Sequence, residues 1–243
     1  MKFTSKLPAA LLAAVGVGLY ASASATTIEF ISESGAVAPS DSRPLGATAS
    51  ITYDPLCTVN CALTVTLANT EQMTGISQGL TDFDFTSAGI TGLTLTGAQG
   101  VSWADCTSGV SCTFTSAAFD AASYGWLLSG SGSYVIAATP LTDAGIVSAD
   151  IVAGSDGVRN DQHNPWLVGP VDFSFTYSGA FSISNVAFSF GTNPESPTVP
   201  GSPCTVNCGD QPPPGVPEPA SLALLAVGMI GLAVTRRRKD TRN

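Results

Sequence analysis

Residues 171–178 have the sequence VDFSFTYS, in which apolar and polar residues alternate without a break. Side chains of a strand point alternately to its two faces, so this segment would place four apolar side chains on one face and polar ones on the other. ALTVTLA at residues 62–68 has the same period of two. We therefore expect both segments to be strands with one buried and one solvated face.

Similar short segments recur between residues 26 and 193, separated by Gly, Ser, Asp and Asn, and no convincing amphipathic helix accompanies them. Many short alternating strands bounded by turn residues are typical of an all-β domain. We predict one antiparallel, jelly-roll-like β-sandwich over residues 26–193. Its predicted core contains Leu63, Val65, Leu67, Phe173, Phe175, Phe188 and Phe190.

The alternation changes phase once, within FSISNVAFSF at residues 181–190. Phe181 and Ile183 share one parity, whereas Val186 and the two following phenylalanines share the other. A β-bulge or a tight turn at Ser184-Asn185 would keep both sets on the core face, so we predict one there.

The N-terminus has the three parts of a secretory signal peptide. Lys2 and Lys6 precede an apolar run at residues 7–20, and Ala23-Ser24-Ala25 has the form of a cleavage site. The run is shorter than the roughly 20 residues that a membrane span needs. We expect residues 1–25 to be removed and the mature protein to be exported.

All six cysteines occur in close pairs, and two pairs belong to a repeated pentapeptide, CTVNC. An exported chain meets an oxidising environment, so we expect three local disulfides. The pairs are Cys57–Cys61, Cys106–Cys112 and Cys204–Cys208. Alternatively, the second pentapeptide could be bridged back to the first. A metal site made of the two C-x3-C pairs is disfavoured, because oxidised sulfurs do not bind metal, and we predict no metal and no cofactor.

The charge of the body is strongly acidic. Between Thr26 and Gly215 there are sixteen acids and two bases, Arg43 and Arg159. Such a surface repels phosphate backbones, which excludes nucleic acid as an expected partner.

The sequence offers little for catalysis. His163 is the single histidine, and each cysteine has a pairing mate. Asp82 and Asp84 share a strand face, the spacing that glycoside chemistry or calcium binding would need. With phenylalanines on the opposite face, solvated outer-face acids explain the pattern better. We predict that the protein is not an enzyme.

Two further groups of residues leave alternatives open. Asp156, Asn160 and Asp161 are oxygen donors, but their spacing favours a turn over calcium binding. Three tryptophans could stack on sugar rings or fill the core. These are Trp103, Trp126 and Trp166.

The composition changes after residue 193. Residues 194–215 are crowded with proline, which cannot continue a sheet, so we expect an extended linker. Residues 220–235 are uncharged and would span about 24 Å as a helix, which we predict to be a single transmembrane helix. The basic stop at Arg236, Arg237, Arg238 and Lys239 would stay cytoplasmic and leave the body outside.

The order of these tail features resembles a known sorting signal. Val216, Pro217, Glu218 and Pro219 stand directly before the apolar segment and the basic stop. Residues 216–239 are thus similar to the PEP-CTERM signal of Gram-negative bacterial surface proteins. The resemblance implies recognition and processing by an exosortase, a membrane precursor stage, and a role in the envelope or biofilm matrix, with exopolysaccharide as a possible partner.

Three functions are therefore considered. The leading hypothesis is a non-catalytic exported protein of the envelope or matrix. The second is a carbohydrate-binding surface module that uses the tryptophans. The third is a secreted hydrolase, which the presence of a single histidine disfavours.

Overall fold

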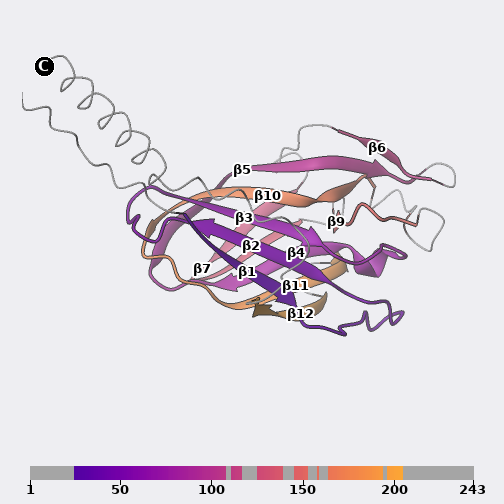
Figure 1. Cartoon of the computed structure of the whole chain (residues 1–243), viewed down its shortest axis with the longest axis horizontal. Coiled ribbons are helices and arrows are strands. Elements are labelled where there is room, and N and C mark those ends of the chain that lie inside the picture. The colour runs from indigo at the N-terminus through magenta and orange to yellow at the C-terminus, as the bar shows by residue number, and fades with distance from the viewer. Residues whose placement is uncertain are drawn as a thin grey trace, which may run out of the picture. The chain divides into compact units, whose positions relative to one another are not determined.

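The computed structural model describes residues 25–107, 111–116, 125–138, 145–152, 158, 164–193 and 196–204. This part of the chain is built from β-strands and one short 3-10 turn, in one compact unit, which confirms the all-β prediction (Figure 1). The elements are β1 (Thr26–Ser32), β2 (Ala47–Tyr53), β3 (Cys61–Asn69), η1 (Ile76–Gln78), β4 (Leu80–Thr86), β5 (Ile90–Asp105), β6 (Thr113–Thr115), β7 (Trp126–Ser131), β8 (Ser133–Ala138), β9 (Ile146–Val147), β10 (Trp166–Gly179), β11 (Ser184–Asn193) and β12 (Ser196–Pro203).

The strands form one hydrogen-bonded sheet that closes on itself. Its order is β6-β5-β10-β3-β2-β1-β12-β11-β4-β8-β7. The two-residue strand β9 pairs in parallel with β10 and antiparallel with β4. These pairings complete a barrel of eight strands, from which β5 and β6 extend beside β10, and β8 and β7 extend beside β4.

The expected sandwich of separate sheets is therefore wrong. Alternation shows that each strand has one buried face, and both a sandwich and a barrel satisfy that condition. The difference lies in whether the strand edges meet. Ile146 and Val147 join β10 to β4, and this pairing of remote segments leaves no mark on the local sequence.

The predicted core is confirmed. All seven of its residues are at most 2% exposed. Strands β10 and β3 bring Phe173 opposite Val65 and Phe175 opposite Leu63. Trp126 of β7 packs on Phe173, with ring centroids 5.1 Å apart. Burying each large apolar side chain contributes about 1.5–3 kcal/mol, so these contacts dominate the stability of the fold.

The predicted irregularity at Ser184-Asn185 is also confirmed. Asn185 has a positive φ of 49°, and the pairing of β11 with β4 shifts register between Ser184 and Ala187. As a result Ile183 packs against the core from one side of the bulge and Val186 is buried on the other.

The predicted linker begins too early, because β12 lies within it. Residues 201–203 pair with β1, and residues 198–200 pair with β11. Proline lacks an amide donor but keeps its carbonyl acceptor. The Glu33 amide accordingly donates to the Pro200 carbonyl oxygen at 3.0 Å. The rest of the linker, residues 205–215, lies outside the described residues.

Strand β1 begins at Thr26, directly after the predicted signal peptide. Within the described residues, no helix is long and apolar enough to cross a membrane. The predicted span at residues 220–235 and residues 1–24 of the signal peptide lie outside that part of the chain, so both stay predictions.

Candidate functional site

The sorting motif at residues 216–219 and the basic stop at residues 236–239 lie outside the described residues. Two features of the described body are built well enough to be considered as sites. One is an apolar groove, and the other is a network of polar side chains around Gln78.

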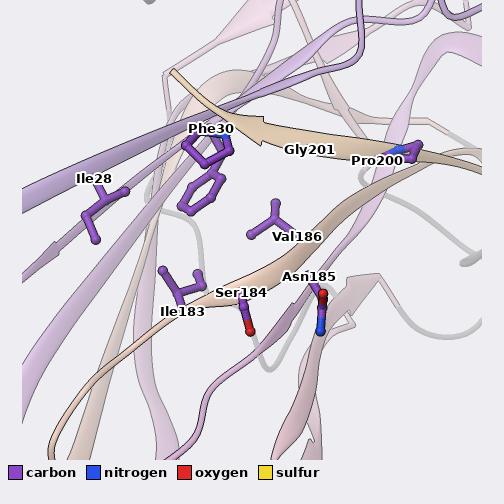
Figure 2. Close-up of a pocket in the computed structure, with 9 residues that line it drawn as sticks. Ile28, Phe30, Ile183, Ser184, Asn185, Val186, Pro200 and Gly201 are labelled. Atoms are coloured by element: carbon purple, nitrogen blue, oxygen red, sulfur yellow. The ribbon is translucent and has the colours of Figure 1, made fainter. Parts of the chain in front are cut away.

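The groove lies between β1, β11 and β12 and has a volume of about 540 Å³ (Figure 2). It opens where β12 leaves β11 after the Pro200–Ala187 pair and continues along β1. The bulge at Asn185 lies at the same place and bends β11. Its apolar walls are Ile28, Phe30, Ile183, Val186, Pro200 and Pro203.

This lining determines what the groove can bind. Ser184 and Asn185 are the polar side chains among its lining residues, and none of those residues carries a titratable group. Such a surface suits an aliphatic side chain or a hydrocarbon. It supplies no acid, base or nucleophile for catalysis.

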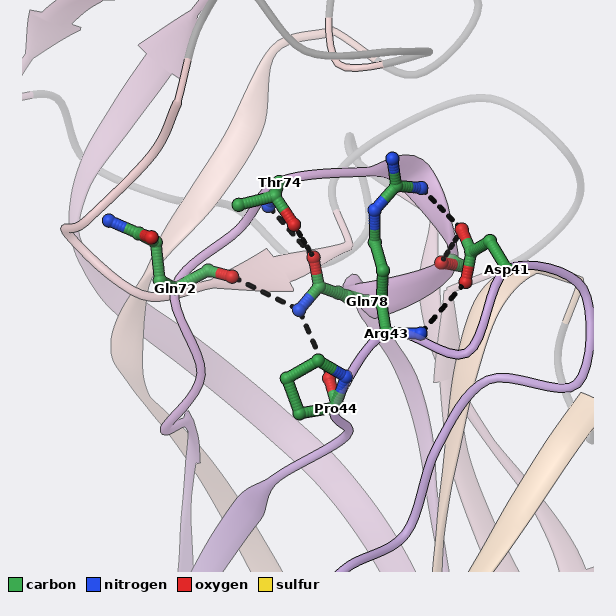
Figure 3. Close-up of polar contacts among 7 residues, drawn as sticks. Asp41, Arg43, Pro44, Gln72, Thr74 and Gln78 are labelled. Carbon is green, nitrogen blue, oxygen red and sulfur yellow. Dashed lines mark hydrogen bonds and ion pairs between the residues drawn. The ribbon is translucent and has the colours of Figure 1, made fainter.

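The polar network is centred on Gln78 in η1, which is 1% exposed (Figure 3). Its Oε1 accepts hydrogen bonds from the Thr74 amide at 2.8 Å and from the Thr74 hydroxyl at 2.9 Å. Its Nε2 donates to the Pro44 and Gln72 carbonyl oxygens, each at 3.0 Å. Because both acceptor positions and both donors of the amide are used, the network fixes two loops to each other and offers nothing to a ligand.

An ion pair continues the network toward solvent. Arg43, the only Lys or Arg among the described residues, pairs with Asp41. The Ser77 hydroxyl donates to the same carboxylate at 2.7 Å. Partial burial opposes ionisation of Asp41, but the hydrogen bonds from Ser77 and Arg43 and the Arg43 charge outweigh it and lower its pKa.

The expectation that Asp82 is solvated is wrong. Asp82 is fully buried, whereas Asp84 is half-buried. Strand β4 is central, and Asp82 lies in register between Ser189 of β11 and Ala137 of β8. Leu80 on the same face is also fully buried, so this end of the outer face is covered.

Tyr177 is a second buried polar residue. It is 2% exposed, and its hydroxyl has no hydrogen-bond partner within the described residues. Burial raises the pKa of Tyr177, and the nearby Asp54 carboxylate and Tyr53 add to the effect. The ring packs on Phe181 with centroids 5.6 Å apart, which gives it a place in the core.

The tryptophans belong to the interior. Trp103, Trp126 and Trp166 are 6%, 0% and 2% exposed. Stacking on a sugar ring needs an open ring face, so the hypothesis that these side chains bind carbohydrate is wrong for this structure.

Two of the predicted disulfides are present. Cys57–Cys61 and Cys106–Cys112 are bonded, with Cα atoms 5.6 and 4.1 Å apart. The first bond rules out both a bridge from the second CTVNC to this pair and a metal site that uses it. Cys204 is disulfide-bonded too, and its partner lies outside the described residues.

The described residues contain no group of three or more His, Cys, Asp and Glu side chains that could hold a metal ion. His163, Asp156, Asn160 and Asp161 lie outside them.

The comparison with known families identifies the tail. The PEP-CTERM protein-sorting motif matches residues 215–239. The chain is a PEP-CTERM sorting domain-containing protein. The match begins one residue before the predicted PEP-CTERM signal and ends at the same residue. No curated protein and no solved structure matches the chain.

The PEP-CTERM motif indicates an exported protein that an exosortase sorts. Sequence reasoning found this site because its three parts are contiguous. The sequence analysis did not predict the groove, although the phase change at Asn185 marks the bulge beside it. It also did not predict the Gln78 network, and no pattern in the sequence indicates that network.

Proposed function

We propose that the protein is a non-catalytic component of the cell envelope or biofilm matrix, whose tail an exosortase recognises and processes. The observation that carries the proposal is the PEP-CTERM match at residues 215–239.

The chemistry of the tail supports this order of events. Pro217 and Pro219 favour an extended backbone that a membrane-embedded enzyme can reach, and Glu218 adds a charged handle. The apolar segment at residues 220–235 holds the precursor in the inner membrane, and the basic stop keeps its end cytoplasmic. After processing, the body moves to the envelope, the cell surface or the medium.

Features of the body fit a structural role outside the cell. Its disulfides suit an oxidising compartment. Its acidic composition keeps an exposed protein soluble. The lining of the apolar groove carries no titratable group, and both donors and both acceptor positions of the Gln78 amide are used. Exopolysaccharide remains the expected neighbour in such a matrix.

Replacing Pro217, Glu218 and Pro219 with alanine in the native host tests the proposal. The expected result is an unprocessed precursor retained in the inner membrane, while the wild type loses its tail and moves outward. A matched control replaces Pro212, Pro213 and Pro214 with alanine, which also removes prolines before the helix but leaves the motif intact. The control should be processed normally.

Mass spectrometry of the mature C-terminus and fractionation of the envelope give the readout. Identical termini and location for the wild type and the motif variant would overturn the proposal. The protein would then be an ordinary single-span membrane protein.

A further inference from the structure

The most exposed large apolar side chains of the described residues lie together on the loop between β2 and β3. Leu56 is 78% exposed and Val59 is 68% exposed. Val37, in the loop after β1, follows at 52%. Single exposed aliphatic residues are common, but two on one short loop form a prominent apolar tip.

The backbone of this loop is held firmly. The Cys57–Cys61 bond closes it, and the Leu56 amide donates to the Asp54 carboxylate at 2.9 Å. The Gly179 amide donates to the Thr58 carbonyl oxygen at 2.8 Å. Because the backbone is fixed, Leu56 and Val59 are presented to solvent at little further cost in conformational entropy on binding.

The loop lies at the end of the barrel from which the chain continues to its tail. Tyr53, the last residue of β2, pairs with Thr26 at the start of β1. The Cys204 amide donates to the Glu29 carbonyl oxygen at 2.8 Å, so β12 runs toward the same end. Val37 follows the other end of β1 and is therefore at the opposite end of the barrel.

The tail keeps this end near a membrane while the precursor is anchored. Fifteen residues separate Cys204 from Ala220. Even at full extension, that length of chain reaches at most about 50 Å. Such a tether turns weak contact with the bilayer into an intramolecular event at a high effective concentration.

The charge of the tip is compatible with a lipid surface. Asp54 at the start of the loop is charged, but residues 55–70, which include Leu56 and Val59, carry no charge, although the body as a whole is acidic. The tip can therefore approach a bilayer, whereas the body is repelled by anionic headgroups. We infer that the Leu56–Val59 tip inserts shallowly into the lipid surface to which the precursor is tethered, an inference that rests on the proposed function.

The test uses the full chain reconstituted into phosphatidylcholine vesicles whose acyl chains are brominated close to the headgroups. Val59→Trp places a fluorophore at the tip, and Val37→Trp is the matched control at the opposite end. The three native tryptophans are buried and contribute the same background to both variants. The lipid should quench the introduced tryptophan at position 59 and not the one at position 37.

Two further measurements test the cause of the quenching. Adding Leu56→Ser should lower the ratio of docked to undocked tip by about 10-fold, because one aliphatic anchor is lost. In vesicles with phosphatidylglycerol, quenching should rise with salt, because screening weakens the repulsion of the acidic body.

Equal quenching at both positions, or quenching that falls as salt is added, would overturn the inference. So would crosslinks between copies through the tip without quenching, because a second copy would then be the partner. A chain that fails to enter vesicles through its tail would overturn the inference together with the anchored precursor. Quenching at the tip combined with normal processing of the Pro217, Glu218 and Pro219 variant would overturn the proposed function alone.

Discussion

The Gln78 network allows a sharp test, because Gln78→Glu changes one group and almost no volume. Nε2 of Gln78 donates to the Pro44 and Gln72 carbonyl oxygens. A neutral glutamic acid can donate only one hydrogen bond, so one buried carbonyl loses its donor. That loss costs about 1–3 kcal/mol of stability even when the new side chain is uncharged.

The pH dependence of the stability of Gln78→Glu tests the burial of this side chain more directly than the loss of one hydrogen bond does. An ionised glutamate at position 78 would be buried and would face a carbonyl oxygen, so its pKa in the folded protein is raised above the unfolded value of about 4.3. At higher pH the folded state then holds more protons than the unfolded state, and stability falls as pH rises. The loss is about 1.4 kcal/mol for each pH unit until the folded pKa is reached.

Urea unfolding followed by the fluorescence of the buried tryptophans gives the free energy of unfolding at several pH values. The difference between wild type and Gln78→Glu should grow above about pH 5, by about 1.4 kcal/mol for each pH unit, until the folded pKa is reached. Gln99→Glu is the matched control, because Gln99 is exposed on β5. Gln99 lies opposite Asp172, so the new carboxylate is weakly repelled, but at this exposed position its difference from wild type should stay within about 1 kcal/mol at all pH values.

Equal pH dependence for the two variants would refute the reasoning. It would mean that the side chain at position 78 reaches water and that the network in Figure 3 does not hold the two loops together.

Two other predictions concern a backbone conformation and an ion pair. Asn185 has a φ of 49°, so Asn185→Ala should lower the free energy of unfolding by about 1 kcal/mol and Asn185→Gly should be nearly neutral; equal losses in urea unfolding would contradict this. The pKa of Asp41 lies below its ordinary value of 3.8, so its ionised form stabilises the fold above that pH and the stabilisation is lost as pH falls. Asp41→Asn should therefore flatten the acid-unfolding curve followed by tryptophan fluorescence, and an unchanged curve would count against the ion pair.

Local signals in the sequence were sufficient for several features of this protein. The alternation around Phe173 and Val65 identifies buried strand faces because side-chain direction depends only on the strand period. The phase change at Asn185 marks the bulge for the same reason. The PEP-CTERM motif is recognisable because its parts follow one another directly along the chain.

Tertiary structure decided how those strands meet. Closure depends on Ile146 and Val147, which join β10 and β4, and a two-residue strand has too little sequence to be recognised. The prolines of β12 suggested a linker, yet this strand pairs with β1 and β11, and the Pro200 carbonyl oxygen accepts a hydrogen bond from the Glu33 amide. Asp82 is buried because neighbours from remote segments cover its strand, and only the assembled sheet brings such neighbours together.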